Sequence, residues 1–163
     1  PYIAGLFDGE GTVSLCYTKI RPKKSNPNQN IHGFKFVVGI SNTYLPILEM
    51  VREIFDGDIS GCNVINLPRI RQAWAWKVTG RPTQLKFLQA IKPFSIIKAT
   101  QVSLALEYLD TVQKVGGRIN QEIYEKRVVI YEKLRDANRR GFPKEPSHHP
   151  KTRLSGEAQR WAK

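Results

Sequence analysis

Long apolar runs and cysteines are both scarce in this sequence of 163 residues. No segment approaches the roughly 18 to 20 apolar residues that span a bilayer. Nothing resembles a secretory leader, although the sequence starts without Met and could have been trimmed at this end. Cys16 and Cys62 are too few and too far apart for a metal knuckle or a disulfide framework, so we expect reduced thiols and assign them no function. We therefore expect an intracellular protein without a membrane partner, in the cytoplasm or nucleoid of a prokaryote or in an organelle.

Acidic residues are absent from two long stretches, 11–48 and 59–106. The formal net charge is +12, and charge alone fits either nucleic acid or a membrane surface. The acid-free stretches favour nucleic acid, because a phosphate backbone would meet attraction there and little repulsion. Solvated side chains that happen to lack acidic neighbours are the alternative explanation. The unopposed cations are Lys19, Arg21, Lys23, Lys24, Lys35, Arg69, Arg71, Lys77, Arg81, Lys86, Lys92 and Lys98.

The length fits one compact domain, and the apolar pattern predicts an α+β fold of order αββαββα. We expect an antiparallel sheet with helices on one face and the other face open. A long exposed hairpin tip, 21–32, joins the first two strands. The predicted elements are a helix at 2–7, strands at 12–20 and 34–41, a helix at 44–55, strands at 59–66 and 70–79, and helices at 82–91 and 98–115.

Apolar residues alternate with other residues in the second and fourth predicted strands. This period of two predicts that one face of the sheet lies in the core and the other is available to a ligand. Tyr17, Trp74 and Trp76 are expected in the core rather than as stacking platforms for bases. The apolar rows are Phe34, Phe36, Val38 and Ile40, and then Trp74, Trp76 and Val78.

A second segment, 116–163, follows the expected core domain of residues 1–115. Gly116 and Gly117 end a helix, and the pattern at 119–138 suggests another, amphipathic helix. Residues 139–163 contain seven Lys or Arg against two Glu. This tail fits either an extended arm along DNA or a disordered basic end without a specific role.

Residues 3–11, Ile-Ala-Gly-Leu-Phe-Asp-Gly-Glu-Gly, resemble the signature of the LAGLIDADG homing endonucleases, and Thr12-Val13 continue it into a strand as in that family. Both acidic positions match, although the final carboxylate is Glu where Asp is common. The αββαββα order adds a second agreement, so the resemblance covers residues 1–110 and leaves the tail uncovered. With one motif per chain, it implies a homodimer whose antiparallel sheets form a DNA-binding saddle.

The resemblance implies a site-specific double-strand break in a long, near-palindromic DNA target. Glu10, helped by the Gly9 carbonyl, would hold Mg²⁺, or Mn²⁺ or Ca²⁺ at the same site, because hard cations take carboxylate and phosphate oxygens. Asp8 would cap the turn or its partner helix. Ala4 and Gly5 would pack against their symmetry mates and bring two copies of Glu10 together.

Two further active-site residues follow from the same resemblance. Lys98 occupies the place of a lysine near the scissile phosphate, with an exposed helix-start lysine as the alternative. Asn42 falls where the family often has a polar residue that organises active-site water, and a helix cap ahead of Tyr44 is equally consistent with its position.

Strand residues of opposite parity to the apolar rows are expected to face the duplex, where base and phosphate contacts mix. Those on the strands are Thr12, Ser14, Cys16, Thr18, Lys35, Val37, Arg69, Arg71 and Lys77. The residues of the first hairpin that we expect to reach outer base pairs or the DNA backbone are Lys19, Arg21, Lys23, Lys24, Asn26, Asn28, Gln29 and Asn30.

Two other functions remain open from the sequence. The same fold could serve as a non-cleaving RNA- or DNA-binding protein, an intron maturase or a transcription regulator, which makes intron RNA a second candidate partner. A basic structural protein of a ribonucleoprotein would instead be a monomer without a defined DNA target.

Overall fold

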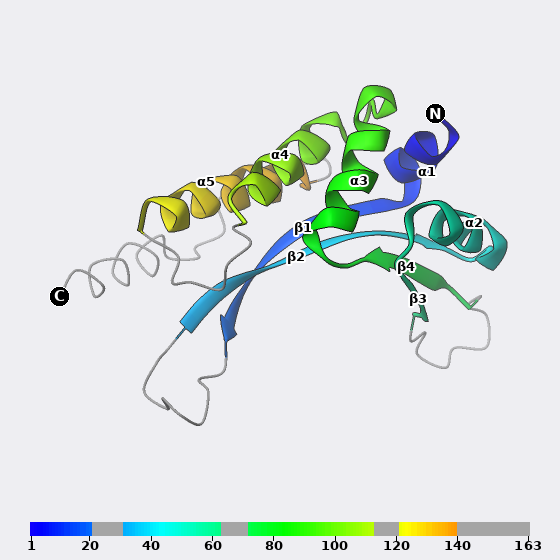
Figure 1. Cartoon of the computed structure of the whole chain (residues 1–163), viewed down its shortest axis with the longest axis horizontal. Helices are drawn as coiled ribbons and strands as arrows, with labels where there is room; N and C mark the ends of the chain where they lie inside the picture. The colour runs from blue at the N-terminus through cyan, green and yellow to red at the C-terminus, as the bar shows by residue number, and fades with distance from the viewer. Residues whose placement is uncertain (21–30, 63–71, 113–120, 140–163) are drawn as a thin grey trace.

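The structure of the chain, a computed structural model, describes residues 1–20, 31–62, 72–112 and 121–139. Figure 1 shows the helices on one side of the long strands. The elements in chain order are α1 (Tyr2–Glu10), β1 (Gly11–Ile20), β2 (Ile31–Asn42), α2 (Leu45–Phe55), β3 (Asp58–Gly61), β4 (Trp74–Val78), α3 (Arg81–Ile91), the short 3-10 helix η1 (Lys92–Phe94), α4 (Ala99–Asp110) and α5 (Gln121–Ala137).

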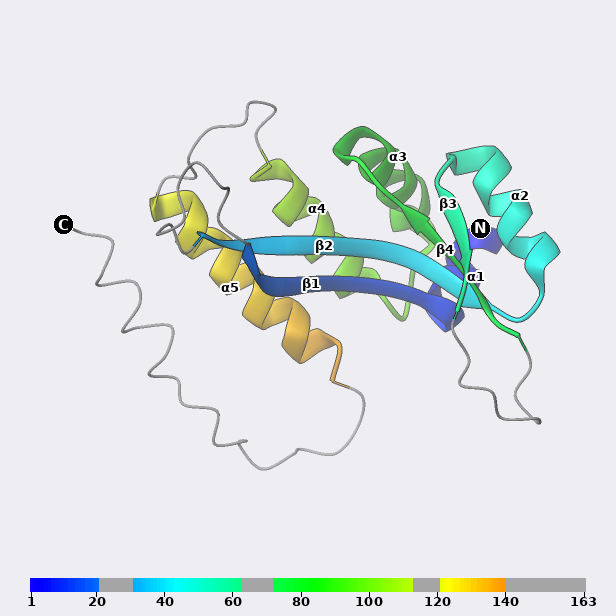
Figure 2. The ribbon, with the colours of Figure 1, turned by 90° about the horizontal axis from the view of Figure 1, so that it is seen from below.

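Four antiparallel strands form one sheet in the order β1-β2-β4-β3. β1 and β2 pair from Gly11 opposite Ile40 to Ile20 opposite Ile31, and β4 then pairs with the end of β2 that lies nearest α1. Seen from below, β1 and β2 cross in front of α4 (Figure 2). The predicted α+β fold with its antiparallel sheet is confirmed.

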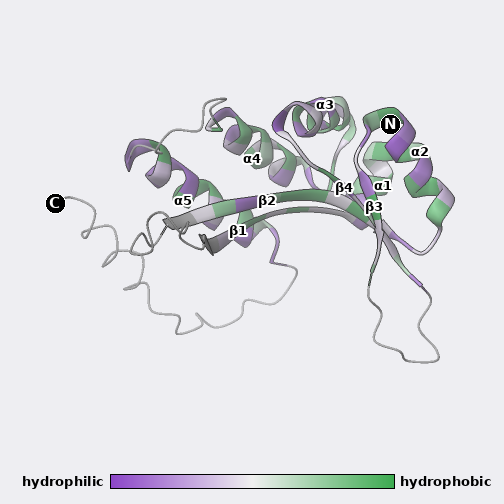
Figure 3. Ribbon diagram, turned by 60° about the horizontal axis from the view of Figure 1, so that its bottom comes forward, coloured by the Kyte–Doolittle hydropathy of each residue, from purple (hydrophilic) through white to green (hydrophobic). Residues whose placement is uncertain are grey.

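The core lies between the sheet and the helices, as the alternation predicts. Figure 3 shows the hydrophobic stretch of β2 beneath α3 and α4. Phe87 of α3 packs at its centre, with ring centroids 5.3 Å from Phe7, 5.1 Å from Phe55 and 4.9 Å from Trp76. These are edge-on contacts, the arrangement that aromatic rings prefer. The strand residues buried in this core are Val13, Leu15, Val38, Ile40, Trp76 and Val78.

The second hairpin is shorter than the alternation suggested. β3 ends at Gly61 and β4 begins at Trp74, so that Gln72 and Ala73 precede the paired part of β4. Residues 63–71 lie outside the described part of the chain. The helix predicted at 98–115 ends earlier, at Asp110. Trp74 and Tyr17 are half-buried and Trp76 is fully buried, in line with their expected place in the core.

α5 packs on α4 and on the outer edge of β1. Ile130 and Leu134 are buried in the same hydrophobic core as the sheet. The buried Arg127 donates to Thr111 Oγ1 at 2.9 Å and to the Thr111 carbonyl at 2.7 Å, which satisfies an oxygen at the end of α4. The predicted amphipathic helix at 119–138 is therefore present, and it shares the core of the preceding elements. The described helices are too short or too polar to cross a membrane.

Candidate functional site

α1 runs directly into β1 without a linker. The Gly11 N–H still donates to the Phe7 carbonyl, while its own backbone is extended at φ −75° and ψ 155°. A Cβ built on Gly11 would lie 2.3 Å from Phe7 O and 2.4 Å from the Phe7 ring, so only glycine fits this close approach. The junction fixes the last residue of α1, Glu10, at the end of the sheet.

Asp8 is buried, and its carboxylate holds the turn that precedes α4. It accepts hydrogen bonds from Ser95 Oγ at 2.5 Å and from the backbone N–H of Ile96, Ile97 and Lys98 at 2.6, 3.0 and 3.1 Å. Burial raises the pKa of Asp8, but these four hydrogen bonds outweigh burial and lower the pKa below its ordinary value. Asp8 thus ties the end of α1 to the start of α4 within its own chain.

Lys98 is buried beside Asp8. Its Nζ donates to the Asp8 backbone carbonyl near the C-terminal end of α1, where the helix dipole favours a cation. The alternative of an exposed helix-start lysine therefore does not hold for Lys98. The Lys98 ammonium group thus lies at the backbone carbonyl of Asp8, and Asp8 precedes Glu10 by two residues in the chain.

Glu10 and Gly9 are both exposed. Among the residues that the structure describes, no three His, Cys, Asp or Glu side chains gather as a metal site. The donor set nevertheless fits Mg²⁺, which binds through one or two carboxylates and completes its shell with water and substrate phosphates. A carboxylate at an open helix end, next to the exposed Gly9 with its backbone carbonyl, is such a partial set.

Asn42 lies at the same end of the sheet as Glu10, because Ile40 pairs with Gly11 two residues earlier. Its Oδ1 accepts a hydrogen bond from the Tyr44 N–H at 2.8 Å, just ahead of α2. In the ladder Asn42 has the parity of the core residues Val38 and Ile40. The Asn42 side chain thus closes a turn just ahead of α2, whose own first turn receives no side-chain cap, and the predicted part of Asn42 in the active site stays a prediction.

The open face of the sheet carries residues of the predicted parity. Thr12, Cys16, Lys35 and Lys77 are exposed, and Ser14 and Val37 are half-buried. Nothing is described of the Thr18 and Lys19 side chains. The other predicted DNA-contacting residues lie outside the described part of the chain: Arg21, Lys23, Lys24, Asn26, Asn28, Gln29, Asn30, Arg69 and Arg71.

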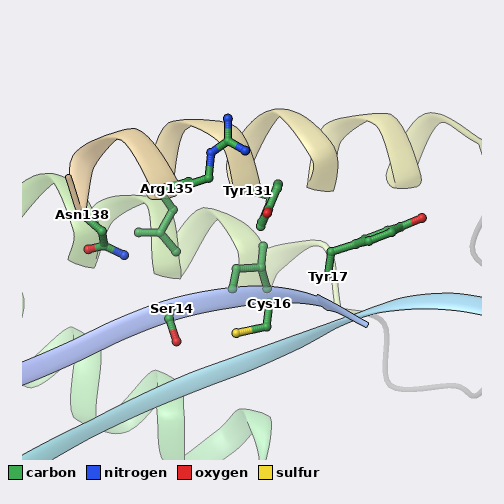
Figure 4. A pocket seen from close by; sticks show the side chains of 8 residues that line it. Ser14, Cys16, Tyr17, Tyr131, Arg135 and Asn138 are labelled. Atoms are coloured by element: carbon green, nitrogen blue, oxygen red, sulfur yellow. The ribbon is translucent and has the colours of Figure 1, made fainter. Parts of the chain in front are cut away.

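Two features near this face were missed from the sequence. Asp58 opens β3 opposite Lys77, which places an acid on the open face, although in the sequence it follows just after the helix predicted at 44–55. A groove also runs between β1 and α5 (Figure 4). There Asn138 Nδ2 donates to the Val13 carbonyl at 2.8 Å and covers the edge of β1. The polar residues of this groove include Ser14, Cys16, Tyr131 and Arg135.

The outer side of α1 differs from the prediction in one residue. Ala4 is only 1% exposed and packs in the core of its own chain, so it does not face outward as the predicted interface requires. The exposed small residues are Gly5 and Gly9, one helical turn apart on the same side of α1. Nearby, Ile96 and Ile97 are 85% and 74% exposed, although both are large and apolar.

The order and arrangement of these elements are those of the LAGLIDADG homing endonuclease fold. One similar structure is that of an archaeal intron-encoded homing endonuclease, I-Vdi141I, complexed with DNA. The superposition covers 98% of this chain and 94% of that chain, with a TM-score of 0.73 and 17% sequence identity. A second is that of the homing endonuclease I-CvuI, complexed with a DNA target in the presence of Mg. It covers 88% of this chain and 83% of that chain, with a TM-score of 0.67 and 14% sequence identity.

A third match links the fold to the family by name. The LAGLIDADG homing endonuclease I-GzeII in complex with its DNA target covers 80% of this chain over 42% of its own, with a TM-score of 0.61 and 13% identity. No family model and no curated protein matches the sequence. The resemblance seen in residues 3–11 is thus confirmed at the level of the fold.

Proposed function

We propose that this protein is a site-specific homing endonuclease that makes a double-strand break in a long, near-palindromic DNA target. It acts as a homodimer and hydrolyses phosphodiester bonds with a divalent metal. The observation that carries the proposal is the division between the two acids of the motif. Asp8 is buried and fully engaged as a cap, whereas Glu10 is exposed at the end of the sheet.

Glu10 and the Gly9 carbonyl would hold the metal together with DNA phosphate oxygens. When bound there, Mg²⁺ would supply two effects, activation of a water as nucleophile and stabilisation of negative charge on the leaving oxygen. Mn²⁺ and Ca²⁺ accept the same oxygen ligands. Lys98, anchored on the Asp8 carbonyl, keeps a positive charge at the junction and stabilises charge that develops on the phosphate.

The homodimer supplies the second active site that a duplex cut requires. Gly5 and Gly9 lie on one side of α1, where a second copy of α1 can approach closely because no side chain intervenes. The exposed Ile96 and Ile97 would be covered by the same contact, since large exposed apolar groups mark interaction surfaces. This pairing sets the two Glu10 side chains near one twofold axis.

The open face of the sheet is the proposed DNA surface. Lys35 and Lys77 are exposed on it. In the ladder Lys77 shares a row with Thr12 next to the α1–β1 junction, and Lys35 lies opposite Cys16 further along the strands, with Ser14 between the two rows. Lysines fix the position of the DNA by contacts with its phosphates, and the shorter polar side chains can reach base edges in the major groove. The matched structures of I-Vdi141I and I-GzeII contain DNA, which supports this choice of partner.

The test replaces Glu10 with Gln, which keeps the shape of the side chain and removes the metal-binding charge. We expect cleavage of a selected target to fall by at least about 100-fold with DNA binding largely kept. Glu53→Gln, at an exposed position of α2, is the matched control and should cut like the parent protein.

Wild-type cleavage by Glu10→Gln would contradict the catalytic assignment. A parent protein that binds a defined duplex or intron RNA and never cuts would instead identify a maturase or a transcription regulator.

A further inference from the structure

One row of residues crosses the open face of the sheet near the α1–β1 junction. The ladder aligns Thr12 of β1 with Gly39 of β2, Gly39 with Lys77 of β4, and Lys77 with Asp58 of β3. Residues directly opposite each other in antiparallel strands point to the same face, with Cβ atoms about 5 Å apart. Lys77 and Asp58 are therefore neighbours on the face that is proposed to bind DNA.

Gly39 decides where the Lys77 side chain lies. A Cβ built on Gly39 would stand 2.4 Å from the Trp76 carbonyl and 3.2 Å from Lys77 Cγ, so the backbone excludes a side chain at Gly39 and the lysine stem lies close to the bare glycine. The Lys77 stem therefore starts out beside Gly39 of β2. In the described part of the chain, no ion pair or hydrogen bond engages the Asp58 carboxylate, although Lys77 is its cross-strand neighbour.

Asp58 is the one acidic side chain on the open face among the strand residues that the structure describes. An unneutralised carboxylate repels phosphates, so it does not serve general attachment to the DNA backbone. On a duplex, a carboxylate is instead favoured opposite a hydrogen-bond donor, and base amino groups in the major groove are such donors. In the major groove, cytosine presents the N4 amino group without an adjacent acceptor on the same base, whereas adenine places the N7 acceptor beside its N6 amino group.

We infer that Asp58 and Lys77 together read one G·C base pair in the major groove of the target, a role that rests on the proposed function. Asp58 accepts a hydrogen bond from cytosine N4, and Lys77 donates to guanine O6 or N7 of the same pair. Cytosine presents a donor and guanine presents acceptors, and the cross-strand pair offers an acceptor and a donor side by side on one face. Gly39 is the positioning residue, because its missing side chain leaves room for the Lys77 stem.

The test selects binding sites for the full-length protein from a random duplex library, in buffer without divalent cations so that binding is measured apart from cleavage. The four duplexes that differ at the candidate base pair are then compared for the parent protein and for Asp58→Asn, Lys77→Gln and Asp56→Asn. The last is the matched control, because it removes the same charge two residues away, outside the strand.

The parent protein should prefer cytosine at one position of each half-site by about 10- to 100-fold over other bases. Asp58→Asn should reduce that preference to about threefold or less and leave other positions unchanged. Lys77→Gln should weaken the preference at the same base pair, and Asp56→Asn should show the same preference as the parent. Thermal melting shows whether each variant is folded, and a misfolded Asp58→Asn is replaced by Asp58→Ser in the same comparison.

Three outcomes would overturn the inference. Asp58→Asn could bind every duplex more tightly by the same factor, which would show a charge effect without sequence reading. The preference could persist in Asp58→Asn, or it could vanish equally in Asp56→Asn. If the parent protein selects and cuts a target in these cases, only the reading by Asp58 fails, whereas a parent that selects no duplex contradicts the proposed function as well.

Discussion

Asp8 and Glu10 are separated by one residue and have opposite surroundings. Asp8 lies 8% exposed and accepts hydrogen bonds from Ser95 and from the turn before α4, while Glu10 is open to solvent. A carboxylate in the first environment stabilises the fold, and one in the second is free to bind a cation. The junction at Gly11 separates the two roles, because it ends α1 directly after Glu10.

Replacing Asp8 with Asn should lower the free energy of unfolding by about 2 to 3 kcal/mol at neutral pH, because several buried donors lose a charged acceptor. The Asp8 pKa is lowered in the folded state, so its contribution is complete above the ordinary pKa of an aspartate. It declines as pH falls through the folded pKa. Urea unfolding of parent and variant between pH 7 and pH 2.5 measures this difference.

The control for this experiment is Glu53→Gln, which removes an exposed carboxylate from α2. It should change the unfolding free energy by about 0.5 kcal/mol or less at every pH. A parent–variant difference for Asp8→Asn that stays constant, or grows, as the solution is acidified would contradict the assigned role of the charged carboxylate.

At the level of elements, the close approach of β2 and β4 depends on one position without a side chain. Gly39 faces the Trp76 carbonyl and the Lys77 stem, and the carbonyl belongs to a backbone that is held in the ladder. The same strands place Trp76 against Phe87 in the core. A change at Gly39 therefore acts on both faces of the sheet.

Gly39→Ala should lower the free energy of unfolding by about 1 to 3 kcal/mol, because the added methyl collides with backbone that must shift. Gly9→Ala is the matched control. Nothing lies within 4 Å of a Cβ at Gly9, so Ala in this helix should raise the stability of the monomer by about 0.5 to 1 kcal/mol. Denaturant titration separates the two, and equal effects of both substitutions would contradict the steric explanation.

At the level of the whole molecule, the open face of the sheet carries the exposed lysines. α1 presents Gly5 and Gly9, which have no side chains, beside the exposed Ile96 and Ile97. α5 completes the opposite end of the fold, where Arg127 satisfies the end of α4 and Asn138 covers the edge of β1. With that edge covered, the surface of Gly5 and Gly9 is the proposed route to a second copy.

Gly5→Leu tests this assembly without disturbing the fold. No atom lies within 4 Å of a Cβ at Gly5, so the monomer should keep its unfolding free energy or gain up to about 1 kcal/mol. A partner helix would have no room for the new side chain, and sedimentation with target duplex should show one protein copy per duplex instead of two. Gln89→Leu, exposed on α3, is the control and should remain dimeric. A dimer that persists in Gly5→Leu would place the interface elsewhere.

Local patterns in the sequence determined much of this architecture. The alternation from Phe34 to Ile40 and around Trp76 defined which face of each strand enters the core, because neighbouring side chains in a strand point to opposite sides. Residues 3–11 located the helix that runs into a strand, and the acid-free stretches indicated where cations gather. These features depend on residues that are close in the chain.

Only the tertiary structure decided which distant residues meet. The partners of Asp8 lie 87 to 90 residues away, the burial of Lys98 follows from that contact, and the helix packing buries Ala4 while exposing Gly9. Asp58 reached the open face through the register with Lys77, which sequence spacing does not determine. Periodicity sets the direction of a side chain, whereas its neighbours depend on how separate elements pack and align.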